Sequence, residues 1–201
     1  ASMDKRIGRV ERKTTETNIT VEFDVDGSGL AEVNTGIGFY DHMFNAFAKH
    51  GRFNLNIEAQ GDLHVDAHHT MEDVAICVGQ AIDQALGDRA GINRMASALV
   101  PLDEALVQVV LDISGRPFSS ISFDFVGEQI GEVPTEMVSH VLGSLASAGK
   151  LTLHVNQLAG SNDHHIAEAA MKAFGRALDT ATVIDDRIIG KIPSTKETLT
   201  S

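Results

Sequence analysis

The sequence predicts an α+β fold built twice, in which two similar halves each pack a mostly antiparallel sheet on helices as a two-layer α/β sandwich. Three observations predict it. The pattern His-His-x-x-Glu occurs at residues 68–72 and again at 164–168. The two helices that start there align without gaps, which equates Gly79 with Gly175. Strand-like and helix-like segments also follow one another in the same order in both halves. We therefore expect an internal duplication, although two amphipathic helices can also resemble each other by chance.

The first half-repeat, residues 3–98, is expected to run strand, strand, helix, strand, helix. Residues 19–25 alternate apolar and polar side chains, the period of a half-buried strand. The Asp-Gly-Ser-Gly stretch at 26–29 supplies the residues that a tight hairpin needs. A longer helix is expected from His68 to a stop at Gly87. The shorter helix before it is predicted by apolar residues at helical spacing, namely Phe39, Met43, Phe44 and Phe47.

The second half-repeat, residues 99–196, is expected to follow the same order. Residues 104–125 predict two strands joined at Ser114 and Gly115, and a helix is expected after Pro134. Residues 150–158 predict a further strand, which precedes the second His-His-x-x-Glu helix. The two halves should therefore form one functional domain.

Composition excludes several classes of protein. With 201 residues and 43% hydrophobic side chains, the chain can bury a real core. No apolar run is long enough for a membrane span, and the opening residues lack the apolar segment of a signal peptide. A formal net charge of −12 argues against a nucleic-acid surface. Cys77 is the one cysteine, so no internal disulfide can form, which suits the cytoplasm.

The repeated histidines point to metal binding. Residues i and i+4 of a helix share one face, so His68 should converge with Glu72 and His164 with Glu168. His69 and His165 must then point elsewhere. A histidine in the middle helix of each half completes a set of eight candidate ligands. The pseudo-symmetric division gives His42, His69, His164 and Glu168 to one ion, and His140, His165, His68 and Glu72 to the other.

Four imidazole and carboxylate ligands leave two positions open on an octahedral ion. This favours Mn²⁺ or a similar divalent metal over a closed structural zinc site. We expect the two helix starts on opposite sides of one subunit, so that a neighbouring subunit supplies the complementary half of each site. Metal binding would then stabilise the assembly.

Several motifs, taken together, resemble the imidazoleglycerol-phosphate dehydratase family across essentially the whole chain. They are "FYDHM", "AHHTMEDVAICVGQAI", "GINR", "PLDEAL", "LDISGRP", "NDHHIAEAAMKAFGRAL" and "IPSTK". The resemblance implies a hydro-lyase of histidine biosynthesis that binds two Mn²⁺ per subunit. It also implies a homo-oligomeric 24-mer with active sites between subunits, and imidazoleglycerol phosphate as substrate.

Carried onto this sequence, the family's metal ligands fall on the eight residues above, with Glu72 and Glu168 among the catalytic set. The resemblance makes Glu16 the catalytic base. Substrate and phosphate contacts are implied for Arg94, Arg116, Lys172, Ser194, Thr195 and Lys196. We interpret Lys196 as part of a lid over the phosphate. One departure is Glu197, which stands where the family commonly has glycine after the "PSTK" lysine.

The implied reaction fits this chemistry. Metal cations on the ring nitrogens would favour the imidazolate, which expels the neighbouring hydroxyl and gives a diazafulvene-like intermediate. A carboxylate base, Glu16, can then remove a proton that was not acidic before. The product is imidazole acetol phosphate plus water.

Two other classes remain open from the residues alone. A metal-dependent hydrolase would share the clustered His and Glu, and its product would separate the two. A non-catalytic metal-storing oligomer would need no phosphate site, and finding Arg94, Arg116 and Lys196 far from the metals would favour it. Arg94 and Arg116 could also be ordinary surface arginines, and Glu16 a solvated strand residue.

Overall fold

The computed structural model describes residues 4–200, so the expected start of the first half-repeat at residue 3 lies outside the described residues. The first half forms a four-stranded sheet in the order β1-β2-β4-β3. All of its neighbouring strands are antiparallel except β3 and β4, which run parallel. Its strands are β1 (Ile7–Lys13), β2 (Thr17–Asp24), β3 (Ala31–Asn34) and β4 (Asn54–Gly61).

The second half repeats this topology. Its sheet has the order β5-β6-β10-β7, again with one parallel pair, β10 and β7. The strands are β5 (Met95–Leu102), β6 (Ala105–Asp112), β7 (Phe118–Ser122) and β10 (Thr152–Ala159). A short hairpin of β8 (Gln129–Ile130) and β9 (Val133–Pro134) is inserted between β7 and the next helix. This insertion has no counterpart among the described elements of the first half. Two similar halves with mostly antiparallel sheets are therefore confirmed.

Two sequence-based expectations about the strands are wrong. The expected order omitted the first strand of each half, β1 and β5. The stretch at 26–29 makes no β2–β3 hairpin, because β4 lies between these strands and pairs with both. The Ser28 and Leu30 backbone N–H groups instead donate to the side chain of Asn54. Apart from these two points, residues 98 and 99, between which the half-repeats are expected to divide, both lie in β5, whose residues all pair with β6.

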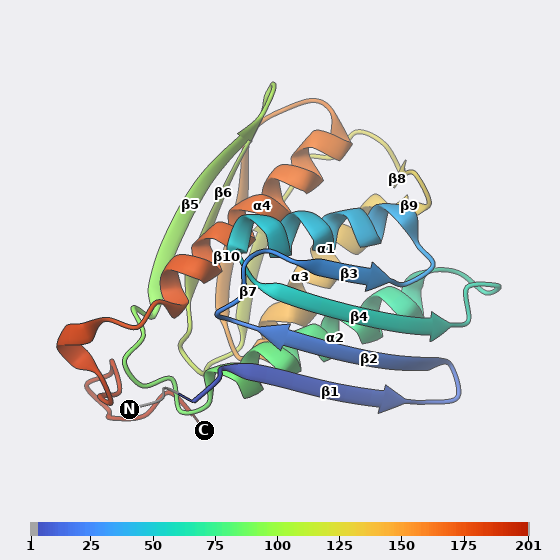
Figure 1. Ribbon diagram of the computed structural model, residues 1–201. Coiled ribbons are helices and arrows are strands. Elements are labelled where there is room, and N and C mark those ends of the chain that lie inside the picture. Colours follow the sequence, from blue (N-terminus) through green and yellow to red (C-terminus); the bar gives the residue numbers. More distant parts are fainter. Residues whose placement is uncertain (1–3, 201) are drawn as a thin grey trace.

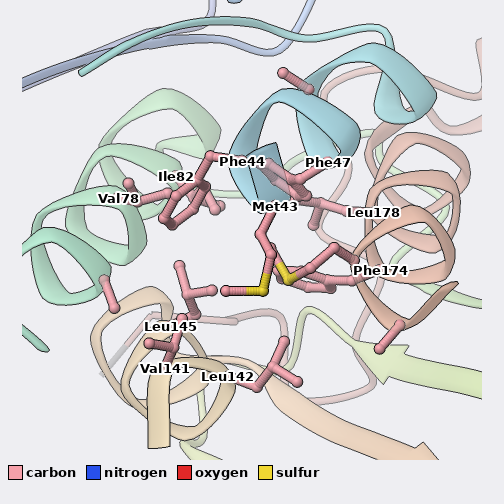
Figure 2. Packing of buried hydrophobic residues seen from close by; sticks show 14 of the residues in the cluster. Met43, Phe44, Phe47, Val78, Ile82, Val141, Leu142, Leu145, Phe174 and Leu178 are labelled. Atoms are coloured by element: carbon pink, nitrogen blue, oxygen red, sulfur yellow. The ribbon is translucent and has the colours of Figure 1, made fainter. Parts of the chain in front are cut away.

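Four helices lie between the two sheets (Figure 1). They are α1 (Gly38–Gly51), α2 (His68–Leu86), α3 (Thr135–Gly149) and α4 (Asp163–Thr182), and a short 3₁₀ helix, η1 (Asp186–Ile188), follows. The helices pack across the halves, because α1 packs against α4 and α2 against α3. Figure 2 shows Phe47 of α1, Ile82 of α2, Leu145 of α3 and Phe174 of α4 pointing into one shared core. The duplication therefore produces one domain.

Two equivalent glycines permit these helix crossings. A Cβ at Gly175 would lie 2.4 Å from the Phe47 backbone oxygen of α1. A Cβ at Gly79 would lie 2.7 Å from the Ala148 side chain of α3. Both distances are too short for a real carbon contact, so glycine allows the helices to approach closely.

The remaining expectations concern single features of the chain. Gly87 ends α2 with φ 54°, as predicted, and Pro134 directly precedes α3. Cys77 is buried and free. No helix within residues 4–200 combines the length and the apolar character that a membrane span requires.

Candidate metal centres

The packing of α1 on α4 brings three candidate ligands together, and we name them the α1–α4 cluster: His42, His164 and Glu168. His42 Nε2 lies 2.9 Å from Glu168 Oε1, and His164 Nε2 lies 3.6 Å from Glu168 Oε2. The two imidazole rings have their centroids 5.5 Å apart. Both histidine side chains are nearly half exposed, so an ion could reach them from solvent.

The packing of α2 on α3 builds an equivalent set, the α2–α3 cluster: His68, Glu72 and His140. His140 Nε2 lies 2.6 Å from Glu72 Oε2, and His68 Nε2 lies 3.2 Å from the same oxygen. The hydrogen bond from His140, with a second from His68, lowers the pKa of Glu72 below its usual value. This carboxylate is therefore ionised and ready to bind a cation.

The clusters agree with one expectation and correct another. His68 and Glu72 converge, as do His164 and Glu168, which is the predicted i/i+4 geometry. The expectation that a neighbouring subunit supplies the complementary half is wrong for these residues. Each cluster already combines a His-His-x-x-Glu helix of one half with the middle helix of the other, because the helices pack across the halves.

The second histidine of each tandem pair lies outside the two clusters of its own subunit. His69 Nδ1 lies 2.7 Å from Asp62 Oδ2 and 3.5 Å from Glu16 Oε2. His165 Nδ1 forms a short hydrogen bond with Glu104 Oε1. Within the described subunit, His69 and His165 therefore do not join the ion sets to which the sequence assigned them. Each cluster thus has three candidate ligands, and a fourth imidazole would have to come from elsewhere.

Carboxylates determine the electrostatics around these two histidines. The hydrogen bond from His165, supported by the backbone N–H groups of Ser161 and Asn162, lowers the pKa of Glu104 to about 2. The hydrogen bond with Asp62 raises the pKa of His69, and the same bond lowers the pKa of Asp62. Both acceptors are therefore ionised at neutral pH.

The candidate phosphate residues gather at one end of the second half. Arg94 donates to both oxygens of Asp112 and to the backbone oxygen of Pro193, which precedes Ser194. The Ser194 hydroxyl accepts from the Lys196 backbone N–H. Arg116 lies in the turn after β6 and donates its backbone N–H to the Ser114 hydroxyl. We name Arg94, Arg116, Ser194 and Lys196 the basic end.

The C-terminal segment is docked on this basic end. Leu199 is buried, and a Cβ at Gly115 would lie 2.1 Å from the Leu199 backbone oxygen. Glu197, at the position where the family commonly has glycine, adopts φ 58°, a conformation that glycine reaches without steric cost. The segment thus keeps the shape expected of a glycine-containing loop. Thr195 belongs to the same turn.

Within one subunit, the basic end lies far from the clusters. The Arg94 backbone N–H donates to Ala181 at the end of α4, whereas His164 lies at the start of that helix. At 1.5 Å per residue this separation is about 25 Å along the axis. In Figure 1 the helices begin toward the right, and the segment after α4 lies at the lower left. Lys172 is the exception, because its Nζ lies 3.7 Å from Glu168 Oε1 in the α1–α4 cluster.

Sequence reasoning missed Asp62. It directly follows β4, seven residues before His69, in a stretch that also holds His64 and Asp66. The signal in the sequence that could have identified Asp62 is its position shortly before the tandem histidines. Its role depends on how the loop returns toward α2, which the sequence does not show.

The donor atoms suit a divalent metal. In each cluster, two Nε2 atoms and one carboxylate oxygen lie within 4.8 Å of one another. Imidazole and carboxylate are borderline and hard ligands, a combination that Mn²⁺ accepts. An additional imidazole would bring each set to four protein ligands.

Comparisons with known proteins agree over nearly the whole chain. Residues 35–178 match the family model described as "Imidazoleglycerol-phosphate dehydratase". A protein of that name from Chloroflexus aurantiacus is 55% identical over 201 residues, which covers 99% of this chain and 98% of that protein. Among solved structures, the imidazoleglycerol-phosphate dehydratase of Staphylococcus aureus superposes with a TM-score of 0.79 at 37% identity, covering 89% of this chain and 99% of that one. The structure of IGPD from Pyrococcus furiosus gives a TM-score of 0.81 at 34% identity, with coverage of 94% and 100%.

Proposed function

The chain belongs to the imidazoleglycerol-phosphate dehydratase family, and from this premise we propose that its dehydration reaction depends on two divalent metal ions per subunit, with Mn²⁺ as the natural choice. It is a carbon–oxygen lyase of histidine biosynthesis. The substrate is then imidazoleglycerol phosphate and the products are imidazole acetol phosphate and water.

The α1–α4 and α2–α3 clusters are the observation on which this proposal rests. His42, His164 and Glu168 would hold one ion, and His68, Glu72 and His140 the other. Bound there, the two cations would acidify the substrate imidazole and stabilise its anion, which has two nitrogens to hold.

Glu16 is suited to the proton transfer. Its side chain is half exposed in the turn between β1 and β2, and its carboxylate lies 3.5 Å from His69. The hydroxyl next to the ring anion would leave as water, taking up the proton that the ring releases, and this would give the diazafulvene-like intermediate, in which the neighbouring C–H is acidic. Glu16 accepts the proton of this C–H group as general base, and the resulting enol tautomerises to the ketone.

The basic end supplies the phosphate contacts. Arg116 and Lys196 can make charge-assisted hydrogen bonds to phosphate oxygens, while Arg94 holds the C-terminal segment through Pro193. Because this end lies far from the clusters of its own subunit, a complete site needs a second subunit. A large distance between these basic residues and the clusters would by itself favour a metal-storing oligomer. Active sites between subunits would account for the same distance in an enzyme.

The outer face of the second sheet is consistent with self-assembly. Met95 and Leu99 of β5 and Phe118 of β7 are each more than half exposed, and Val110 of β6 lies beside them. Clustered apolar side chains of this kind mark contact surfaces. We propose a homo-oligomer, with the 24-mer as its full form.

An assay with imidazoleglycerol phosphate tests the function directly. Metal-free protein should be inactive, and added Mn²⁺ should restore formation of the ketone product with the phosphate ester intact. Release of inorganic phosphate would indicate a hydrolase instead. Retention of bound Mn²⁺ with no turnover of the substrate would indicate a metal-storing oligomer.

A further inference from the structure

The two halves place a glutamate at the same position. Glu16 directly precedes β2, and Glu104 directly precedes β6. The hairpins also share one register, because Ile7 pairs with Asp24 in the first half as Met95 pairs with Asp112 in the second. Glu16 and Glu104 are therefore structural counterparts, each beside the second histidine of a tandem pair.

These counterparts do not make the same contacts. Glu104 binds Nδ1 of His165 and also accepts from the Ser161 and Asn162 backbone N–H groups. In the first half, Asp62 Oδ2 takes the place at His69 Nδ1 with a distance of 2.7 Å. Glu16 stays at 3.5 Å from the same nitrogen.

The protonation of each imidazole follows from its acceptor. An ionised carboxylate can only accept, so Nδ1 of His69 and of His165 must carry the hydrogen. In the neutral ring, Nε2 then presents its lone pair, which is the form that binds a metal. The four cluster histidines also face their carboxylates through Nε2. With a cation between the cluster side chains, Nε2 would be the metal-facing nitrogen of all six imidazoles.

The position of Asp62 beside His69 is unfavourable for its second carboxylate oxygen. Its Oδ1 is buried, and no hydrogen-bond partner for it lies among residues 4–200. A buried acceptor without a partner is energetically unfavourable. A carboxylate that tolerates this cost to hold one imidazole indicates a function beyond folding.

We propose that Asp62 and Glu104 are positioning residues that fix His69 and His165 as Nε2 metal ligands, and that Asp62 leaves Glu16 free for proton transfer. In the first half, Asp62 binds the second histidine of the tandem pair while Glu16 lies nearby. In the second half, Glu104 binds the equivalent histidine itself. The proposal rests on the metal dependence proposed above, and it adds the reason why one glutamate of an equivalent pair can serve as the base.

Mn²⁺ titration of the metal-stripped full chain tests the positioning role. Glu104→Gln keeps an acceptor for Ser161 and Asn162 but places an amide N–H group against His165 Nδ1, which forces the hydrogen onto Nε2. Asp62→Asn replaces the charged acceptor at His69 Nδ1 with a neutral amide, whose oxygen is a weaker acceptor. Calorimetry should show Mn²⁺ affinity lowered by about 10–100-fold in each variant. Asp103→Asn is the matched control, because it removes a charge from the same turn at a left-handed residue, φ 49°, where asparagine fits.

A second readout separates the two halves. In Asp62→Asn, Glu16 is the nearest remaining carboxylate and should be drawn to His69, so kcat should stay low even at saturating Mn²⁺. In Glu104→Gln, kcat should recover as Mn²⁺ is raised. The double variant Asp62→Asn/Glu16→Gln should bind Mn²⁺ more weakly than Asp62→Asn.

Wild-type Mn²⁺ affinity in folded Glu104→Gln or Asp62→Asn protein would overturn the positioning role. Equal kcat recovery in both variants would overturn the division between Asp62 and Glu16. Circular dichroism checks folding, and Glu104→Gln, in an exposed turn, provides the decisive affinity if Asp62→Asn fails to fold. Failure of the wild type to bind Mn²⁺ would instead refute the proposed metal dependence.

Discussion

The two halves of the molecule are alike inside and different outside. Both sheets share one strand order, and both helix crossings depend on an equivalent glycine. On the outer faces, the first sheet exposes charged residues such as Arg9, Glu22 and Glu58, whereas the second exposes Leu99 and Phe118. The interior is therefore symmetric, whereas the two outer faces differ in polarity.

The clusters show why the interior symmetry persists. Each cluster takes side chains from both halves, so neither half can move its helices without disturbing both clusters. A carboxylate at the edge of a turn is less constrained, and there Glu16 and Glu104 differ in their contacts. The following experiments test how far the equivalence extends.

Removal of metal should have the largest effect and should affect both halves together. Exhaustive chelation is expected to abolish activity and to yield small oligomers, because metal binding adds its free energy to association. Addition of Mn²⁺ should restore large particles and turnover. Light scattering after size exclusion measures both states, and full-sized metal-free particles would refute metal as the source of assembly.

Glu72→Gln and Glu168→Gln should give matching losses. Each variant removes a charged ligand from one cluster, so each should lose one Mn²⁺ per subunit. Affinity at that site should fall by more than the about 10–100-fold typical of a group that only supports a ligand. Metal analysis by mass spectrometry gives the stoichiometry. Two tightly bound ions with full turnover in either variant would contradict the i/i+4 pairing.

Glu16→Gln should break the equivalence of the halves. A general base acts in the proton step, so kcat should fall by roughly 10²-fold or more while metal content and substrate affinity stay unchanged. Glu11→Gln, an exposed carboxylate on the adjoining strand β1, is the control. A normal kcat in Glu16→Gln would assign the base to another carboxylate.

Arg116→Ala and Lys196→Ala test the basic end. Loss of a charge-assisted contact of about 1.5–3 kcal/mol should lower kcat/KM by about 10–100-fold. The dephosphorylated diol should be a poor substrate for the wild type and hardly worse for the variants. Lys13→Ala on β1 controls for charge alone. Variants that discriminate between ester and diol as sharply as the wild type would show that these residues do not bind phosphate.

The glycine crossings should show the smallest effects. Gly175→Ala places a carbon 2.4 Å from a backbone oxygen of α1, whereas Gly79→Ala places one 2.7 Å from the Ala148 side chain and 2.9 Å from two backbone atoms of α3. Both should lower the free energy of unfolding by about 1–3 kcal/mol, with Gly175→Ala the worse. Gly143→Ala on α3, whose nearest atom is the Ser119 hydroxyl at 3.6 Å, should instead stabilise by up to about 1 kcal/mol. Denaturant unfolding of the three variants gives the order, and equal effects of all three would contradict the close crossings.

Local sequence was sufficient where the cause of structure is local. Helix periodicity predicted α2 and α4, and the spacing of His68 with Glu72 fixed a shared face, because four residues make nearly one turn. The duplication was visible because tandem histidines are rare. Besides the two-residue strands β8 and β9, two longer strands were not predicted. In β1 most of the alternating polar residues are charged, and β5 combines small and exposed apolar residues, so neither has a strong period-two pattern.

The sequence by itself identified which residues are candidate metal ligands and indicated that they form two sets. Only the tertiary structure decided that α1 meets α4 and α2 meets α3, and therefore that His42 joins Glu168 and His140 joins Glu72. It also decided that Asp62, and not Glu16, takes Nδ1 of His69. These choices depend on long-range packing of faces that are equally apolar, and no local pattern distinguishes one such partner from another.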